Sequence, residues 1–412
     1  MSIFSMIAGW GLAFAPLPRW EKILFGFWLL GPFLMLIERT PADVWCSLLG
    51  LFFLARSFLM KDFGWIKLSF VRIGALFVFF ASISALLSSN PIFSISELLI
   101  WTRFPLLAVA TVYWFGVDRR MLYLMAASIT VAVTIMCGIM LTEIVVSPTY
   151  TNRLFWPFGD PVSGNYLVKV GLPSTVIMLA YAVSRRGRMS TLAGFFAVLT
   201  IAFSLFAGER VNSLIRVCAG FLAVIAWKPI WSRVVLLVGL EVLIVVLILA
   251  DSESIQNRYL ENFVNELPFH STSGYLKAML PAFWIFDQHP IFGIGPANFE
   301  LFCGDFNLSP TTVHCHPHPH NYYAQLLAET GIVGLLTGGV WMASIVWSCY
   351  KSSRKSGSDV LCAVSFIAPL AFFWPIATTA DFYGQWNNSF MWSSIAFSLA
   401  CALNYRDAVS SA

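Results

Sequence analysis

The feature that most constrains this chain is a succession of apolar segments, each about as long as a membrane is thick. A helix needs about 20 mostly apolar residues to cross the hydrocarbon core of a bilayer. Of the 412 residues, 58% are hydrophobic and only 11% are charged, whereas a soluble domain carries roughly 25% charged residues. The sequence therefore predicts an all-α polytopic membrane protein with about twelve transmembrane helices. The predicted spans are 22–37, 43–60, 68–88, 96–116, 121–146, 165–183, 190–207, 211–227, 233–250, 324–348, 360–378 and 387–404.

Charged residues in the connections predict how the chain is oriented. If the chain crosses the membrane at each predicted span, fifteen Lys and Arg residues fall on one side of the membrane and five on the other. Cytoplasmic loops carry an excess of Lys and Arg, so the first side is expected to be cytoplasmic. The long polar loop 251–323 is then extracytoplasmic. The net charge of +4 is too small to indicate a nucleic-acid partner.

Residues 1–412 are expected to form a single transmembrane domain, because no heptads, low-complexity run or internal repeat divides them. The loop 251–323 is expected to be a folded cap. Apolar residues at helical spacing between Ser273 and Phe286 predict an amphipathic helix on the membrane face. The run from Gln288 to Pro296 has the glycine and proline of turns. Of the eight cysteines, only Cys303 and Cys315 lie in this loop and are candidates for a disulfide.

All six histidines of the chain lie between His270 and His320. Histidine is the side chain whose ordinary pKa of about 6.5 suits proton transfer at neutral pH. His320 precedes the apolar segment that begins at Asn321, and the positive end of a helix disfavours a charged imidazole. A neutral imidazole is what a general base requires. His320 is therefore a candidate base, and the alternative is that it only caps the helix.

Four histidines, His314, His316, His318 and His320, alternate along the chain. Prolines between them favour extended backbone, which would turn the alternate side chains the same way. Such an edge can bind zinc. Zinc ligands usually come from separate elements with supporting partners, and none is identifiable here. We therefore expect a histidine cluster without a metal.

Two further stretches contain charges near the expected outer surface. Glu329, followed by Gly331 and Gly334, lies in a predicted span, where a carboxylate is costly unless it is paired or faces a cavity. Arg210, in the turn from Ala207 to Ser213, has the planar donor fork that matches a phosphate. Its alternative is a surface pairing with Glu209. Arg153 begins a third outer loop, which combines a cation with aromatic and turn residues.

These motifs carry a resemblance to a known family. The run His289–Gly295 (HPIFGIG) and the run His318–Gly334 (HPHNYYAQLLAETGIVG) resemble the signature of the bacterial O-antigen ligase and polymerase superfamily. The loop that begins at Arg153 and the turn at Arg210 resemble other elements of that family in the same order. The resemblance covers the architecture of the whole chain and is specific over roughly 45 residues.

The resemblance implies roles for particular residues. In the family, a histidine that opens the helix after the large periplasmic loop activates the acceptor hydroxyl, and arginines bind the diphosphate of the donor without a metal. His320 is thus the implied base and Arg210 the implied diphosphate ligand, with Arg153 beside it. His318, Asn321, Glu329 and Tyr275 are the expected supporting residues.

The chain departs from the family at one position. Ligases commonly have an arginine after a Ser-Gly pair in the helix of the large loop, whereas Ser273-Gly274 is followed here by Tyr275. We expect Lys277 or Arg258 to supply the missing charge, or the donor to be held differently.

The implied reaction is glycosyl transfer in the bacterial inner membrane, with the site facing the periplasm. The donor would be a glycan on a polyprenyl (undecaprenyl) diphosphate, and the acceptor a hydroxyl of lipid A-core, with inversion at C1 and no cofactor. Polymerisation of O-antigen or exopolysaccharide, in which a second glycan is the acceptor, is the alternative within the superfamily.

Two other classes are less consistent with the sequence. A transporter of lipid-linked glycans also needs many helices, but it does not need a folded loop that holds every histidine, and no paired halves are evident. Metal-dependent membrane glycosyltransferases have an acidic motif in the first outer loop. The nearest match here, Asp251-Ser252-Glu253, comes far too late in the chain.

Overall fold

The computed structural model describes residues 18–147, 154–159, 162–207, 210–251, 256–257, 265, 267, 270, 273–304, 315–357 and 359–410. Within the helices, the side chains of residues 206, 210, 248–251, 303–304 and 405–410 are outside this description. The described residues form helices and turns, with no strand among them. The predicted all-α class is confirmed.

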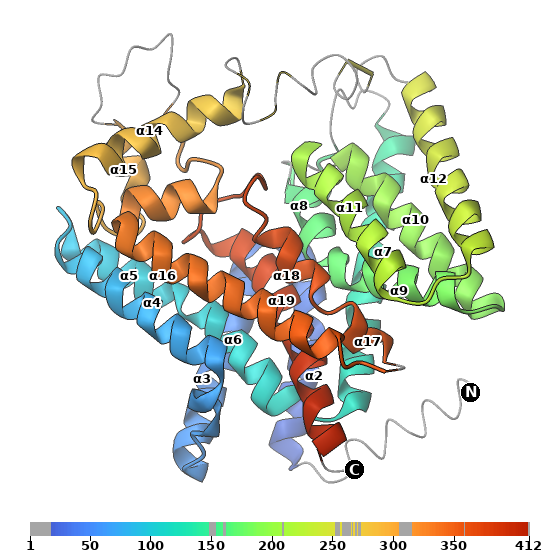
Figure 1. The fold of residues 1–412 in the computed structure, drawn as a ribbon, viewed down its shortest axis with the longest axis horizontal. Coiled ribbons are helices and arrows are strands. Elements are labelled where there is room, and N and C mark those ends of the chain that lie inside the picture. Colours follow the sequence, from blue (N-terminus) through green and yellow to red (C-terminus); the bar gives the residue numbers. More distant parts are fainter. Residues whose placement is uncertain are drawn as a thin grey trace.

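The helices follow the chain in three groups (Figure 1). The first contains α2 Arg19–Ile37, α3 Arg39–Met60, α4 Ser69–Leu86, α5 Pro91–Trp101, α6 Arg103–Ala110 with a π-helical turn at Thr111–Phe115, and α7 Arg119–Val146. The second contains α8 Val162–Lys169, α9 Gly171–Ser184, α10 Arg188–Ala207, α11 Arg210–Ala226 and α12 Trp231–Asp251. The third contains α14 Gly274–Gln288, α15 Phe299–Gly304, α16 Tyr322–Ser353, α17 Val360–Ala363, α18 Ile367–Phe372 and α19 Gln385–Ser410.

The number of membrane spans is smaller than the twelve expected. Seven described helices are long and apolar enough to cross a membrane, and the bent pair α8 and α9 makes an eighth if it is one span. The helix α11 and the segment of α17 and α18 are apolar but shorter. The protein is thus a multi-pass membrane protein, and a count of twelve spans is not confirmed.

Helix α19 lies at the centre of the molecule and contacts α3, α6, α8, α9, α16 and α18. Its Trp392 is fully buried and stacks on Trp341 of α16, with the ring centroids 5.3 Å apart. Trp101 of α5 is also fully buried and stacks on Phe382, with the ring centroids 5.1 Å apart. These aromatic contacts hold the segment before α19 against the N-terminal helices.

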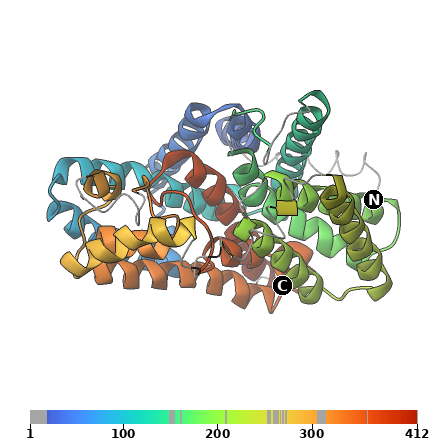
Figure 2. The same cartoon turned by 90° about the horizontal axis from the view of Figure 1, so that it is seen from above.

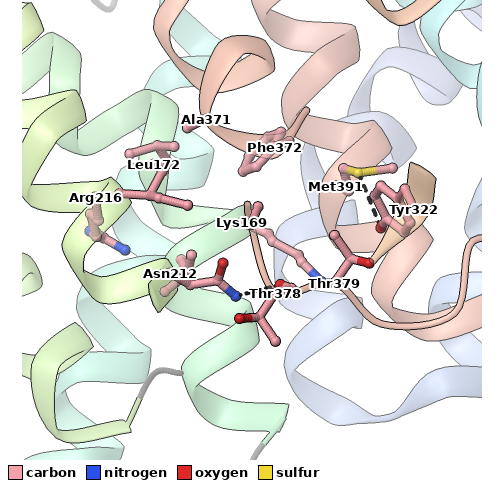
Figure 3. A pocket seen from close by; sticks show the side chains of 13 residues that line it. Lys169, Leu172, Asn212, Arg216, Tyr322, Ala371, Phe372, Thr378, Thr379 and Met391 are labelled. Atoms are coloured by element: carbon pink, nitrogen blue, oxygen red, sulfur yellow. Dashed lines mark hydrogen bonds between the residues drawn. The ribbon is translucent and has the colours of Figure 1, made fainter. Parts of the chain in front are cut away.

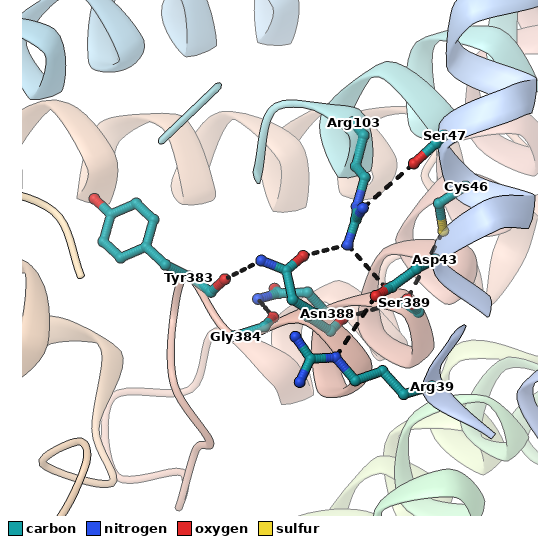
Figure 4. Close-up of polar contacts among 10 residues, drawn as sticks. Arg39, Asp43, Cys46, Ser47, Arg103, Tyr383, Gly384, Asn388 and Ser389 are labelled. Atoms are coloured by element: carbon teal, nitrogen blue, oxygen red, sulfur yellow. Dashed lines mark hydrogen bonds and ion pairs between the residues drawn. The ribbon is translucent and has the colours of Figure 1, made fainter. Parts of the chain in front are cut away.

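Polar contacts fix the start of α19 as well (Figure 4). Arg103 pairs with Asp43 at 2.9 Å and also donates to the side chain of Gln385, the first residue of α19. Asn388 donates to the carbonyl of Phe382 at 2.7 Å. Arg103 lies inside an apolar helix, where a charge is tolerated when it is paired. The segment 378–384 is therefore held by both aromatic and polar contacts.

Helix α16 is broken at Gly331, whose φ of 64° and ψ of −166° are not helical. The parts before and after the break pack against each other, because a Cβ at Gly338 would lie 3.0 Å from Leu326 Cδ1. In a straight helix these residues would be about 18 Å apart. The predicted span 324–348 is thus two helical parts, of which the first, Tyr322–Thr330, is largely buried.

The HPIFGIG motif forms hydrogen bonds with the backbone amides and carbonyls that have no helical partner at the break. The amides of Ile294 and Gly295 donate to the carbonyls of Ala328 and Glu329 at 3.1 and 2.8 Å. In return, the Ile332 amide donates to the Pro290 carbonyl at 2.9 Å. A helix can break inside a membrane protein only where other groups bond the freed amides and carbonyls. The two motifs of the resemblance therefore form one structural unit.

The predicted helix of the large loop is present as α14, and it lies alongside α16 (Figure 2). Its buried side chains include Ala282 and Ile285, which pack with Ala324 and Ala328 of α16. Leu280 is 39% and Phe283 is 47% exposed. The buried face of α14 thus packs on protein, and part of the predicted apolar stripe stays outside.

Cys315 forms a disulfide. Six of the other cysteines are free, and the side chain of Cys303 lies outside the described residues.

Candidate active site

His320 has an unusual backbone conformation, with a φ of +55°. Few residues other than glycine adopt this left-handed region, in which histidine is enriched, and such outliers concentrate at functional sites. The residue that caps α16 is Asn321, whose side-chain oxygen accepts from the amides of Tyr323 and Ala324 at 3.0 and 3.1 Å. The alternative in which His320 itself caps the helix is therefore wrong. The His320 imidazole is half-buried.

Thr379 holds His320 through two contacts. The Thr379 amide donates to the His320 carbonyl at 2.9 Å, and His320 Nδ1 lies 3.4 Å from the Thr379 carbonyl oxygen. A carbonyl oxygen can only accept, so the second contact is a hydrogen bond when Nδ1 carries the proton. In the neutral ring Nε2 is then the nitrogen with the lone pair, which is the atom that a general base uses.

Three aromatic rings surround His320. His318 lies edge-on with its ring centroid 4.4 Å away, His316 at 5.4 Å and Tyr275 at 6.0 Å. Tyr275 occupies the position at which ligases commonly have arginine, and here its ring packs against the candidate base. The expected clustering of His316, His318 and His320 is observed, whereas His314 lies outside the described residues.

His318 has a strongly shifted pKa. Burial, and then the neighbouring charges of His320, His316 and Lys169, lower the pKa of His318 to about 3. Burial disfavours the charged form of a histidine, and nearby cations disfavour it further. His318 is thus neutral at physiological pH, and the charge of Lys169 reaches the histidine cluster.

The turn that contains Arg210 is linked to His320 through the segment before α19. Asn212 of α11 donates to the Thr378 carbonyl at 2.8 Å, and Thr378 precedes the partner of His320. Arg210 is the first residue of α11, and its side chain lies outside the described residues. Two of the predicted stretches are thus brought together.

The other predicted cations are placed only in part. Arg153 and Arg258 lie outside the described residues. Lys277 is half-buried on α14. Residues two apart on a helix do not face the same side, so Lys277 and Tyr275 lie on different sides of α14.

Glu329 is fully buried and does not pair with an arginine within the described residues. Its carboxylate accepts from the Phe299 amide at 3.1 Å and lies 3.4 Å from the side-chain nitrogen of Gln325. Gln325 in turn donates to Asp381 at 2.6 Å and accepts from the Phe382 amide at 2.8 Å. These contacts fix the start of α15 to α16 and favour a structural role for Glu329.

A pocket lies between α8, α11, α16 and the segment before α19 (Figure 3). Two cations line it, Lys169 of α8 and Arg216 of α11, together with Asn212, Thr379 and Tyr322. Lys169 is 6% and Arg216 is 1% exposed. In Figure 3 the Lys169 side chain extends toward Thr379, the residue that holds His320.

Sequence reasoning missed Lys169 and Arg216, although a signal was present. Both residues fall inside predicted membrane spans, where an ionisable residue usually faces the interior or a cavity and marks a functional site. Thr379 carried no such signal, because a threonine in a short connection is ordinary.

An apolar groove lies next to this pocket. It is lined by Tyr323, by Met342, Val346 and Trp347 on the second part of α16, and by Phe373 and Trp374. Neighbouring residues separate the two spaces, because Tyr322 and Phe372 face the pocket whereas Tyr323 and Phe373 face the groove. The groove reaches the site at Pro375, whose carbonyl accepts from the Asn321 side chain at 2.8 Å.

In the part of the chain that the structure describes, no three histidine, cysteine or carboxylate side chains are grouped to hold a metal ion.

Comparison with known proteins gives one match. Residues 173–337 match the family model of O-antigen ligases, and a search of curated proteins found no match to the chain. The matched region contains Arg210, Arg216, the HPIFGIG motif, His320 and the break at Gly331. The family consists of glycosyltransferase-like enzymes that use glycans and lipid-linked substrates in membranes. The match confirms the resemblance that the motifs indicated: over residues 173–337 the chain is similar to the O-antigen ligase family.

Proposed function

We propose that the protein is a glycosyltransferase of the bacterial inner membrane that moves a glycan from undecaprenyl diphosphate to an acceptor hydroxyl at the periplasmic face. The preferred acceptor is lipid A-core, which makes the protein an O-antigen ligase. The observation that carries this proposal is the His320 imidazole, which is held through Nδ1 by the Thr379 carbonyl beside a pocket lined by cations.

The proposed reaction is a single displacement. Nε2 of His320 takes the proton of the acceptor hydroxyl while its oxygen attacks C1 of the donor sugar. The bond from C1 to the diphosphate oxygen breaks, and the diphosphate leaves with the electron pair. Because attack and departure occur on opposite faces of C1, the configuration at C1 inverts.

Cationic side chains stabilise the leaving diphosphate in this proposal. Arg210, with Arg153, Arg258 and Lys277 as the other candidates, would meet the charge that develops on the phosphate oxygens. This is the task that a divalent ion performs in other enzymes. Turnover is therefore expected to persist in EDTA, and loss on chelation with recovery on zinc or magnesium would contradict a metal-free reaction.

The apolar groove suits the polyprenyl chain of the donor. Only a diphosphate separates that chain from the reacting C1, whereas a whole glycan separates the reacting hydroxyl of lipid A-core from its acyl chains. The apolar chain that lies close to His320 is therefore expected to be the polyprenyl chain of the donor. Between Gly339 and Tyr350 the groove follows α16 for about 16 Å.

The decisive experiment supplies purified protein with an undecaprenyl diphosphate glycan and one of two acceptors. A product on lipid A-core supports a ligase, and a product in which a second glycan lipid is extended supports a polymerase. If neither product forms while the protein remains folded, transport of the lipid-linked glycan becomes the better interpretation.

A further inference from the structure

The carbonyl that holds His320 belongs to a segment without regular secondary structure. Residues 373–384, between α18 and α19, form turns and irregular backbone. A carbonyl inside a helix is fixed by the hydrogen bonds of that helix, whereas the Thr379 carbonyl is fixed by contacts with other elements. The position of the His320 imidazole therefore depends on what holds this segment in place.

Gln325 of α16 holds the segment just after Thr379. Its side-chain nitrogen donates to the Asp381 carboxylate at 2.6 Å, and its side-chain oxygen accepts from the Phe382 amide at 2.8 Å. The nitrogen also lies 3.4 Å from the Glu329 carboxylate. Gln325 is only 1% exposed, so water does not compete for these bonds.

The two contacts with the segment require the chemistry and the length of glutamine. One side chain has to donate to a carboxylate and accept from a backbone amide. An amide side chain has an acceptor oxygen and two donor hydrogens, whereas an ionised carboxylate only accepts and a lysine only donates. Asparagine has the same groups but is shorter by one carbon–carbon bond of about 1.5 Å. It would not reach partners that Gln325 meets at 2.6 and 2.8 Å.

Gln325 and His320 belong to the same structural element. His320 directly precedes Asn321, the cap of α16, and the Gln325 amide donates to the Asn321 carbonyl at 3.0 Å, one helical turn later. The Asn321 side chain binds the same segment on the other side of Thr379, through the Pro375 carbonyl at 2.8 Å. Two side chains one turn apart on α16 thus bracket Thr379. They fix the segment relative to the helix that His320 precedes.

We propose that Gln325 is a positioning residue for the candidate base. By tying Asp381 and Phe382 to α16, it keeps the Thr379 carbonyl at Nδ1 of His320. The proton then stays on Nδ1, and Nε2 is the atom that takes the proton of the acceptor hydroxyl. Which nitrogen of a histidine carries the proton is set by the hydrogen bond that the other atoms of the site make with the ring. Gln325 acts through Thr379 and not on the substrate.

The proposal rests on the proposed function for the reaction, but the tautomer of His320 can be measured without any substrate. The full-length protein is labelled with ¹⁵N at histidine and studied by NMR at about pH 8, where an ordinary histidine is neutral. The signals of the two ring nitrogens differ between the tautomers, and the spectrum of His320→Asn shows which signals belong to His320.

Two variants break the Gln325 contacts. Gln325→Leu replaces the amide with an apolar group of similar size, and Gln325→Asn keeps an amide but draws it back from both partners. Each variant should lower the ratio of the Nδ1–H to the Nε2–H tautomer of His320 by about 2- to 10-fold. This is the factor that one neutral hydrogen bond contributes to an equilibrium.

Glycan transfer provides the second measurement. A misplacement of about 1 Å in a reacting group can lower a rate by about 10²-fold. Both Gln325 variants should therefore lower kcat by about 10- to 100-fold per amount of folded protein. KM for donor and acceptor should stay within about threefold of the wild type, because the contacts that are lost are not contacts with a substrate.

Asn298→Leu is the matched control. Asn298 is also an amide side chain that is only 1% exposed, and its nitrogen donates to the Ser94 hydroxyl and to the Ile294 carbonyl at 2.8 Å each. Neither of these partners belongs to the segment 373–384. The substitution should lower the Tm and leave the tautomer ratio and kcat unchanged. An equal change of the ratio in Asn298→Leu would overturn the proposal, because any loss of buried packing would then have the same effect.

Should Gln325→Leu fail to fold, Gln325→Asn decides, since it loses only one methylene and stays polar. A wild-type tautomer ratio in a folded Gln325 variant overturns the positioning role, even if kcat falls. If the ratio changes as expected but the wild type transfers no glycan to either acceptor, the positioning role stands and the proposed transferase does not. If the wild type transfers glycan and the variants keep both the ratio and the rate, the transferase stands and the positioning role does not.

Discussion

The backbone of His320 determines which substitution tests its chemistry fairly. Alanine in the left-handed region costs about 1–2 kcal/mol, so His320→Ala would change the local backbone as well as the side chain. Asparagine populates this region several times more readily than most residues. His320→Asn is therefore the cleaner variant, because it removes the basic nitrogen and keeps the conformation with its φ of +55°.

His320→Asn is expected to lower the rate of glycan transfer by about 10²- to 10⁴-fold, the usual contribution of a positioned general base. Donor binding and thermal stability should stay close to those of the wild type. The rate is measured at equal protein concentration, with His316→Asn as the control, since the ring centroid of His316 lies 5.4 Å from that of His320. A rate for His320→Asn within a few-fold of that of His316→Asn would remove the general base from the mechanism.

His318 predicts how stability depends on pH. Its folded-state pKa is lowered to about 3 by burial and neighbouring charges, whereas an exposed histidine titrates near 6.5. Between these values the unfolded chain binds more protons than the folded chain, so stability falls as pH falls below about 6.5. At pH 5 the loss from this one residue approaches about 2 kcal/mol.

His318→Gln should reduce that pH dependence. The measurement is the Tm of the purified protein in detergent at pH 7.5 and pH 5.0. The difference between the two Tm values should be smaller for His318→Gln than for the wild type. Equal differences in the wild type and His318→Gln would show that His318 can take up a proton without penalty in the folded protein.

At the scale of elements, the break in α16 depends on Gly331. The residue has a φ of +64°, and a Cβ there would overlap the Ile291 carbonyl. Gly331→Ala should therefore destabilise the protein by at least about 2 kcal/mol, because it combines backbone strain with overlap against a rigid backbone group.

Gly339 provides the control for that substitution within the same helix. A Cβ at Gly339 would meet no atom within 4 Å, so Gly339→Ala should be neutral or slightly stabilising through its higher helix propensity. Both variants are compared by Tm and by the yield of monodisperse protein. Equal Tm values would mean that the break does not need glycine.

The sequence predicted the helices much better than the break between them. Apolar length identified the helical segments, because membrane spans depend on a property of adjacent residues. The break at Gly331 depends on hydrogen bonds with Pro290, Ile294 and Gly295, and helical periodicity has no information about such distant partners. The resemblance marked both runs but did not show that they bond to each other.

The candidate site also has a part that the sequence predicts and a part that depends on distant contacts. The position of His320 just before α16 was predictable, because apolar length marks where that helix begins, and its role as a base stays a prediction. Lys169 and Arg216 were only detectable as charges inside apolar segments, since their place in the lining of one pocket depends on how α8, α11 and the segment before α19 pack.

At the scale of the whole molecule, the site lies where two groups of helices meet. Helices α8 to α12 gather on one side, α3 to α5 and α16 on the other, and α19 lies between them (Figures 1 and 2). The cation-lined pocket draws residues from α8, α11, α16, α18 and α19. Neither group of helices can thus form this pocket alone, so the pocket depends on how the two groups pack against each other.

The orientation of this domain in the membrane is the prediction that decides where the reaction occurs. The second part of α16, from Ile332 to Ser353, is about 33 Å long and can cross a hydrocarbon core of about 30 Å. Gln288 at the end of α14 and Lys355 after the end of α16 are both exposed. Because the spanning part of α16 lies between them, the two residues should face opposite sides of the membrane.

A membrane-impermeant thiol reagent tests this orientation in spheroplasts. In a chain whose exposed Cys218 is replaced by serine, Gln288→Cys should be labelled in intact spheroplasts and Lys355→Cys only after permeabilisation. This outcome is expected because the excess of Lys and Arg lies on the side of Lys355, and such an excess marks the cytoplasmic side. The reverse pattern of labelling would place His320 in the cytoplasm, and a transferase that acts at the periplasmic face would then have to be abandoned.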